Sequence, residues 1–127
     1  MAFTNFAPTN MTTNSLPTPY VASASSYYAH HPYKAFDGDP ATYWEADNAW
    51  QYGWLKIDFG SGNSWNALQY DIQARNPAFG SAPKDWTFEG SNDNSNWDIL
   101  DTVTGESAFS NGEIRTYTCD TTGTHYR

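Results

Sequence analysis

Apolar and polar side chains alternate with a period of two along several short segments of the chain. The clearest segment is 54–59, in which Leu55, Ile57 and Phe59 take every second position and polar residues lie between them. Five further segments are expected to be strands: 20–23, 68–74, 86–90, 97–104 and 114–119. Turn-forming residues recur between them, and no window of about 11 to 18 residues keeps a helical period. The pattern predicts an all-β protein, and the regular strand spacing is typical of a two-sheet sandwich.

The first 15 residues differ in composition from the rest of the chain. They are polar and rich in threonine and asparagine, with Phe3 and Phe6 among their few large apolar side chains. We expect residues 1–15 to form a tail or linker that these two phenylalanines can dock. We expect residues 16–127 to form one domain, because a chain of 127 residues can bury a modest single core.

Aromatic content and charge narrow the choice of partner. Aromatic residues make up 17% of the chain, including six Trp and nine Tyr, which is more than a small core needs. Some of these rings are therefore expected to be exposed for binding. The formal net charge of −8 disfavours phosphate backbones and anionic lipid surfaces. We expect neutral ligands such as sugars, or metal cations, and no nucleic acid.

The single cysteine and the start of the chain bear on the cellular setting. Cys119 has no partner cysteine, so no disulfide can form within the chain and a free buried thiol is expected. The first residues carry neither a basic start nor an apolar run, so no signal peptide is expected. No apolar stretch is long enough to span a membrane, and we expect no membrane insertion.

A short acidic loop is the most distinctive stretch of the sequence. Residues 34–44 read KAFDGDPATYW, so Asp37, Asp39 and Thr42 can turn their oxygens to one point. Oxygen ligands of this kind suit a hard cation such as Ca²⁺, although the spacing does not fit an EF-hand. Gly38 lets the backbone curl. The same spacing also fits a plain hairpin turn, since Asp-Gly is a common turn dipeptide.

The acidic loop and two later segments resemble one known family. Residues 35–44 are similar to the signature A-x-D-G-D-x-x-T-x-W of discoidin domains, also called F5/8 type C domains, whose bacterial members are family 32 carbohydrate-binding modules. Residues 53–60 resemble its strand motif G-W-L-x-I-D-F-G, and residues 83–93 resemble P-K-D-F-T-L-x-G-S-N-D. The resemblance runs in order to residue 127. It implies a discoidin-type jelly-roll β-sandwich, similar to galactose-binding domains.

The resemblance also implies a structural calcium site. In the matched positions Asp37, Asp39 and Thr42 give side-chain oxygens and Lys34 gives its carbonyl oxygen. The family continues beyond the position of Arg127 with a last strand, whose final residues complete the metal shell. We therefore expect a C-terminally truncated domain with a weak calcium site. The N-terminal tail, a neighbouring copy or another chain is expected to supply the missing strand.

A ligand face at one end of the sandwich is a further implication of the resemblance. The loop after the first strand offers Tyr27 and Tyr28. Glu45 follows the signature tryptophan, where sugar-binding members often carry histidine, so it departs from the galactose-binding pattern. Arg75 matches the family's arginine, and Asn76 matches the polar group after it. Adjacent loops add candidate stacking rings: Trp50, Tyr52 and Phe79.

Other roles are open for several of these residues. Arg75 also fits an ion pair with Asp71 or Asp85, and Tyr27 and Tyr28 also fit a cover over the edge of the core. Three tryptophans match core positions of the family and are expected to pack inside: Trp44, Trp54 and Trp97.

The chemistry of the sequence favours binding over catalysis. No pair of positioned carboxylates, nucleophile elbow or phosphate-binding loop is evident. We expect a non-catalytic carbohydrate-binding module that attaches a larger assembly to glycans and acts outside cells. Such an assembly is a phage or virus particle, or a glycan-active enzyme. The alternative is a structural protein of a particle or filament, whose missing strand is supplied by a partner or by a neighbouring copy.

Overall fold

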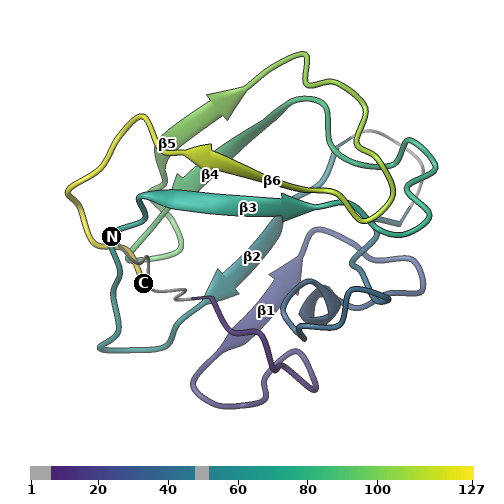
Figure 1. The fold of residues 1–127 in the computed structure, drawn as a ribbon. Helices are drawn as coiled ribbons and strands as arrows, with labels where there is room; N and C mark the ends of the chain where they lie inside the picture. The colour runs from purple at the N-terminus through teal and green to yellow at the C-terminus, as the bar shows by residue number, and fades with distance from the viewer. Residues whose placement is uncertain (1–6, 48–51) are drawn as a thin grey trace. The chain divides into compact units, whose positions relative to one another are not determined.

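The computed structural model describes residues 7–47 and 52–127, and its regular structure is almost entirely β-strand (Figure 1). The elements in chain order are β1 (Val21–Ala24), the 3-10 helix η1 (Pro32–Ala35), β2 (Leu55–Asp58), β3 (Gln69–Gln73), β4 (Trp86–Gly90), β5 (Asp98–Val103) and β6 (Ile114–Thr118). Each strand lies within one residue of a segment that the alternation predicts. The all-β prediction is therefore confirmed.

Two compact units divide the chain, residues 1–63 and residues 64–127. The first unit contains β1, η1 and β2, and β1 pairs with β2 in antiparallel fashion. The second contains two antiparallel pairs, β3 with β6 and β4 with β5. None of the described residues forms a helix long and apolar enough to cross a membrane.

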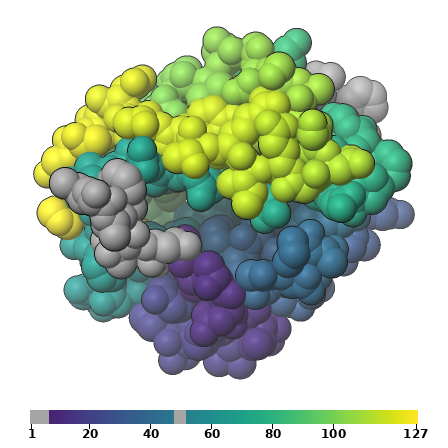
Figure 2. Space-filling model, viewed as in Figure 1, coloured from purple at the N-terminus to yellow at the C-terminus, as the bar shows by residue number. Residues whose placement is uncertain are grey.

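Residues 7–15, the described part of the predicted tail, are built into the first unit. The Met11 side chain is 2% exposed, and its backbone N–H donates to the Phe36 carbonyl at 3.1 Å. Asn14 accepts from the N–H of Ala22 at 2.8 Å through its carbonyl and from the N–H of Tyr33 at 3.1 Å through Oδ1. The dark purple atoms of this segment lie against the violet and blue atoms of the same unit (Figure 2). Phe3 and Phe6, the expected docking residues, lie outside the described residues.

The core of the second unit is shared by its two strand pairs. Tyr70 of β3 stacks on Phe88 of β4 with 4.1 Å between ring centroids. Both rings pack against a buried cluster of three residues, Leu100, Cys119 and Tyr126. Cys119 is buried and forms no disulfide, as the sequence predicts. Alternation explains this packing, because every second residue of β3 and β6 is half-buried and the residues between are exposed.

The prediction that three tryptophans pack in the core is wrong for two of them. Trp54 is 52% exposed and Trp97 is 40% exposed, whereas Trp44 is half-buried. The Trp54 ring lies beside the ammonium of Lys56, 5.4 Å from the ring centroid, which is a favourable contact at a surface. The Trp44 indole donates to the Ser26 carbonyl at 3.0 Å. The hydrogen-bond donor of Trp44 therefore has its partner in a loop, and of these three tryptophans it is the one that is half-buried.

The end of the chain packs on a glycine. Tyr126 and Trp65 exchange backbone hydrogen bonds of 2.9 and 2.8 Å, and the Tyr126 hydroxyl donates to Asp98 at 2.9 Å. The Tyr126 ring lies directly on Gly90, so that a Cβ at position 90 would come within 2.5 Å of Cγ of the ring. A ring can pack this closely only where the strand carries no side chain.

Candidate functional site

The acidic loop forms two successive side-chain turns. Asp37 Oδ1 accepts from the N–H of Asp39 at 3.0 Å, and Asp39 Oδ1 accepts from the N–H of Ala41 at 2.9 Å. Aspartate favours such turns because its short carboxylate reaches the backbone two residues on. Gly38 between them has φ +76°, and a Cβ there would collide with the Thr9 carbonyl oxygen. The loop needs glycine at this position for both reasons.

The Thr42 hydroxyl lies close to one oxygen of the predicted metal set, in the Asp37 carboxylate, and to the Asp39 main-chain carbonyl, which was not in that set. Thr42 Oγ1 donates to Asp37 Oδ2 at 2.7 Å and lies 3.1 Å from the Asp39 carbonyl oxygen. The ammonium of Lys34 lies 3.6 Å from Asp37 Oδ2. Among the described residues, no three side chains of His, Cys, Asp or Glu gather at one point. A cation here would therefore rely on hydroxyl and carbonyl oxygens as well as Asp37, which is a donor set that calcium accepts.

Two predicted ligand residues of the first unit, Tyr27 and Tyr28, lie on one loop, which a third, Glu45, contacts. Tyr27 is 45% exposed and Tyr28 is 71% exposed. The N–H of Tyr28 donates to the Glu45 carbonyl at 3.0 Å, which ties the two predicted segments together. The Tyr27 ring packs on His31, with 4.4 Å between centroids.

The same loop is also fastened to its other neighbours. The hydroxyl of Ser26 accepts from the N–H of Asp47 at 3.1 Å, and that of Ser25 accepts from the N–H of Trp54 at 3.0 Å. Tyr52 is 89% exposed. Trp50, another predicted stacking ring, lies outside the described residues. The first unit therefore presents three exposed tyrosine rings, two of them on a loop that backbone and serine hydrogen bonds hold and the third in the segment before β2. We name Tyr27, Tyr28 and Tyr52 the tyrosine rim.

The predicted ligand residues of the second unit lie on the loop after β3. The guanidinium of Arg75 lies over the ring of Phe79, 5.2 Å from the ring centroid. Phe79 is 76% exposed and has φ +48°, an unusual conformation for an aromatic residue that costs roughly 1–3 kcal/mol. Asn76 is exposed beside them. Asp71 and Asp85, the alternative partners of Arg75, accept hydrogen bonds from Thr116 and Gly105.

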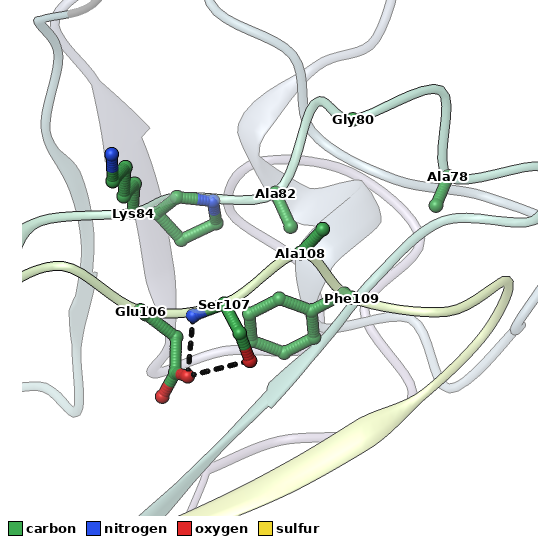
Figure 3. Close-up of a pocket in the computed structure, with 9 residues that line it drawn as sticks. Ala78, Gly80, Ala82, Lys84, Glu106, Ser107, Ala108 and Phe109 are labelled. Carbon is green, nitrogen blue, oxygen red and sulfur yellow. Dashed lines mark hydrogen bonds between the residues drawn. The ribbon is translucent and has the colours of Figure 1, made fainter.

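A cleft that the sequence did not reveal lies in the same unit, and the sequence neighbours of Phe79, Ala78 and Gly80, line it. Its volume is about 320 Å³, and it lies between the loop before β4 and the loop after β5 (Figure 3). Small side chains, Ala78, Ala82 and Ala108, line it together with Phe109. No motif marks these alanines, because the space arises from two loops that meet only in the folded chain.

One arginine holds the acidic groups near this cleft. Arg115 donates to Glu106 at 2.9 Å and to Glu113 at 2.8 Å, and its guanidinium lies 4.0 Å from the ring centroid of Phe109. The hydrogen bond from the Tyr117 hydroxyl, then the N–H of Ser107, lower the pKa of Glu106. Glu106 is therefore an ionised structural group rather than a proton donor.

A buried polar chain lies between the strand pairs of the second unit. The Trp86 indole donates to the Tyr70 hydroxyl at 2.8 Å, and that hydroxyl donates to the buried Asp101 at 2.5 Å. Burial and this hydrogen bond raise the pKa of Tyr70. Each of these polar groups has a hydrogen-bond partner, so the three side chains stabilise the core and leave no reactive group facing the solvent.

Comparison with known proteins gives two findings. Residues 34–127 match the F5/F8 type C family described as NedA-like, galactose-binding domain. The chain is also 31% identical over 90 residues to the peptide-N(4)-(N-acetyl-beta-glucosaminyl)asparagine amidase of Arabidopsis thaliana. That alignment covers 70% of this chain but 12% of the amidase, so the similarity concerns a small part of the plant protein.

Proposed function

The chain belongs to the F5/F8 type C family of NedA-like, galactose-binding domains, and from this premise we propose that it is a non-catalytic carbohydrate-binding module. The observation that carries the proposal is the tyrosine rim. Its Tyr28 ring is 71% exposed, yet the backbone of the same residue is bonded to Glu45. An exposed ring on a fixed backbone suits a sugar, because the apolar face of a pyranose packs on it at little entropic cost.

A second group of ligand residues supports the same proposal. Phe79 presents an exposed ring, and the half-buried guanidinium of Arg75 lies over that ring, 5.2 Å from its centroid. Asn76 adds an amide, which can donate and accept bonds to neighbouring sugar hydroxyls. We assign Arg75, Asn76 and Phe79 to glycan contact in the second unit, and the tyrosine rim with Glu45 to glycan contact in the first.

The state of the carboxylates supports binding rather than hydrolysis. Glycoside hydrolysis requires two carboxyl groups positioned on either side of the bond that is cleaved. Glu106 and Glu113 are both bonded to Arg115, and Asp101 is buried against Tyr70. None of these three is placed to act as an acid or a base on a bound sugar.

Calcium belongs to the proposal as a structural ion. Asp37, Asp39 and Thr42 would hold it through the oxygens that converge around the Thr42 hydroxyl, and Lys34 would contribute its carbonyl oxygen. The ion would displace the Lys34 ammonium from Asp37 and fix the acidic loop. It would take no part in chemistry, because the module performs none.

The plant relative suggests a setting for the module. Its name refers to an N-acetylglucosaminyl-asparagine linkage, which occurs in glycans attached to proteins. We propose that this chain likewise works as one part of a larger assembly, to which it gives affinity for glycans. Neutral glycans suit its net charge of −8 better than anionic ones.

A glycan array followed by titration calorimetry tests the proposal. We expect specific binding, and we expect Tyr28→Ala and Phe79→Ala each to weaken it about 3- to 10-fold, through loss of ring stacking. Ile114→Ala, a change at another exposed apolar residue, is the matched control and should bind as the parent does. An array without specific binding, or variants that all bind equally, would contradict the proposal.

A further inference from the structure

A tight turn presents the exposed ring of Phe79. The N–H of Ser81 donates to the Ala78 carbonyl at 3.0 Å, and the φ values of Phe79 and Gly80 between them are +48° and +68°. This bond and two positive φ values are the features of a type I′ turn. The first central position of such a turn favours asparagine, aspartate or glycine, because these residues tolerate a positive φ. Phe79 therefore occupies a position that its own backbone preference opposes.

The restraint on Phe79 does not come from packing of its side chain. The side chain is 76% exposed, and its ring centroid lies 5.2 Å from the guanidinium of Arg75. A residue in an unfavourable backbone conformation persists only where its surroundings hold it there. Because the ring is largely in solvent, we look for the restraint in the bonds that hold the backbone of the turn.

The turn is anchored at its first residue. Ala78 is 4% exposed and packs in a buried cluster with Ala74 and Phe109. The N–H of Ala78 donates to Asn111 Oδ1 at 2.8 Å, across 33 positions of the chain. This bond ties the residue directly before Phe79 to the turn that precedes β6.

Backbone bonds hold Asn111 in position. The N–H of Gly112 donates to the Arg75 carbonyl at 3.2 Å, and the N–H of Ala74 donates to the Glu113 carbonyl at 2.9 Å. These bonds continue the antiparallel pairing of β3 with β6. Asn111 itself is exposed. A substitution at position 111 therefore removes the side-chain acceptor and leaves the strand pair in place.

We propose that Asn111 is the residue that positions the Phe79 ring for its ligand. The side-chain oxygen of Asn111 holds the N–H of Ala78, and the anchored turn keeps Phe79 at positive φ with its ring in solvent. Loss of this acceptor lets the turn relax to negative φ and moves the ring from its place beside Arg75. The inference rests on the proposed glycan-binding function, to which it adds a positioning residue, and the conformation of the turn can be measured without any sugar.

Nuclear magnetic resonance of the full chain tests the restraint directly. A positive φ brings the amide proton close to Hα of the same residue, so we expect a strong nuclear Overhauser effect between these protons of Phe79. Asn111→Ala should weaken this effect, whereas Asn111→Asp, which retains an acceptor oxygen, should keep it. Asn111→Leu, which has a side chain of similar size and no acceptor, gives the same test if Asn111→Ala does not fold.

A matched control removes a similar bond elsewhere in the same unit. Asn66 Oδ1 accepts from the N–H of Gly123 at 3.0 Å, so it too is an asparagine that fixes the backbone of another segment. Asn66→Ala should leave the Overhauser effect of Phe79 unchanged. An effect lost equally in Asn66→Ala and Asn111→Ala would mean that general destabilisation, and not the bond to Ala78, controls the turn.

A thermodynamic cycle measures the same restraint independently. Phe79→Asn should raise the thermal midpoint of the parent by about 4 °C, because asparagine takes the left-handed conformation with less strain. In the Asn111→Ala background the same change should raise the midpoint less than half as much, because the turn has already relaxed there. An equal shift in both backgrounds would overturn the inference, as would a strong Overhauser effect of Phe79 in Asn111→Ala.

Binding measurements separate this inference from the proposed function. Asn111→Ala should weaken glycan binding about 3- to 10-fold, as Phe79→Ala does, and the double variant should bind no more weakly than Phe79→Ala alone. If the turn relaxes in Asn111→Ala and glycan binding is unchanged, the positioning role is wrong and the glycan-binding function stands. If the turn behaves as expected and no glycan binds to the parent, the proposed function has failed while the restraint on Phe79 is supported.

Discussion

Two acidic turns of this protein each contain an aspartate followed by a residue with left-handed backbone conformation. The hydrogen-bond donors to the aspartate carboxylate differ between the two turns. In the acidic loop, Asp37 precedes Gly38 with φ +76°, and in the turn at 91–96, Asp93 precedes Asn94 with φ +60°. Asp93 accepts from the N–H of Ser95, from the N–H and the side-chain amide of Asn96, and from the Ser91 hydroxyl. Asp37 accepts one N–H and one hydroxyl.

The difference bears on the calcium site that we propose at the acidic loop. Around Asp93 the partners are mainly N–H groups, whose partial positive charge repels a cation. Around Asp37 the Thr42 hydroxyl and the Asp39 carbonyl present oxygens, and an ammonium lies 3.6 Å away where a metal charge could replace it. The proposed calcium site at Asp37 therefore rests on the atoms that face the carboxylate and not on the number of carboxylates in the turn.

The largest expected effect comes from the left-handed residues. Gly38→Ala should lower the free energy of unfolding by about 3 kcal/mol or more, because strained φ adds to a collision with the Thr9 carbonyl. Gly62→Ala is the matched control, since φ is +82° there and the added Cβ meets no atom within 4 Å; we expect about 1–2 kcal/mol. Urea denaturation measures both. Equal losses would mean that the Thr9 contact is unimportant.

Calcium addition should have the next largest effect. At 100 times its dissociation constant, calcium should stabilise the parent chain by about 2.7 kcal/mol, or roughly 10 °C in thermal midpoint. Asp37→Ala should abolish this increment, because it removes the carboxylate of the converging oxygens. Asp93→Ala should keep it, although it lowers the midpoint in the absence of calcium. If calcium still raises the thermal midpoint of Asp37→Ala, the acidic loop is not the calcium site and does not differ from the turn at 91–96 in this respect.

The smallest expected effect is a difference in acid sensitivity. Hydrogen bonds from the Asn96 backbone N–H and amide, then the Ser95 N–H, lower the pKa of the folded Asp93 carboxyl. A lowered folded pKa gives stability that is present above the unfolded pKa of about 4 and is lost as the pH falls toward the folded pKa. Asp93→Asn should therefore lose less stability than the parent between pH 5 and pH 2. Parallel curves in urea denaturation at these pH values would contradict the role given to these bonds.

Strands were predictable where alternation and burial coincide. In β3 the residues Tyr70 and Ile72 are half-buried and their neighbours are exposed, as the pattern requires. β6 was located equally well, but one of its inward positions belongs to a charged residue, Arg115, while Ile114 is 58% exposed. Arg115 can take that position because its charge is bonded to Glu106 and Glu113 and its guanidinium packs on Phe109. Hydropathy alone cannot anticipate such a partner set.

The candidate site was predictable in its parts but not in its connections. The acidic loop could be located because its residues are close in sequence and its turns are local. The bond from Tyr28 to Glu45 and the meeting of Ala82 with Ala108 across the cleft join residues far apart in the chain. The exposure of Trp54 was misjudged for a different reason, since its ring contacts the ammonium of Lys56, two residues away, at the surface.

The packing of the Tyr126 ring on Gly90 couples substitutions at two positions that are far apart in the chain. Any side chain at position 90 would displace the Tyr126 ring. The hydrogen bond from the Tyr126 hydroxyl to Asp98 and the backbone pairing of Tyr126 with Trp65 would then be lost. Conversely, a smaller residue at 126 would leave a void that a methyl group at 90 could refill. Substitutions at the two positions should thus be harmful singly and tolerated jointly, which makes this contact a strong source of epistasis in the chain.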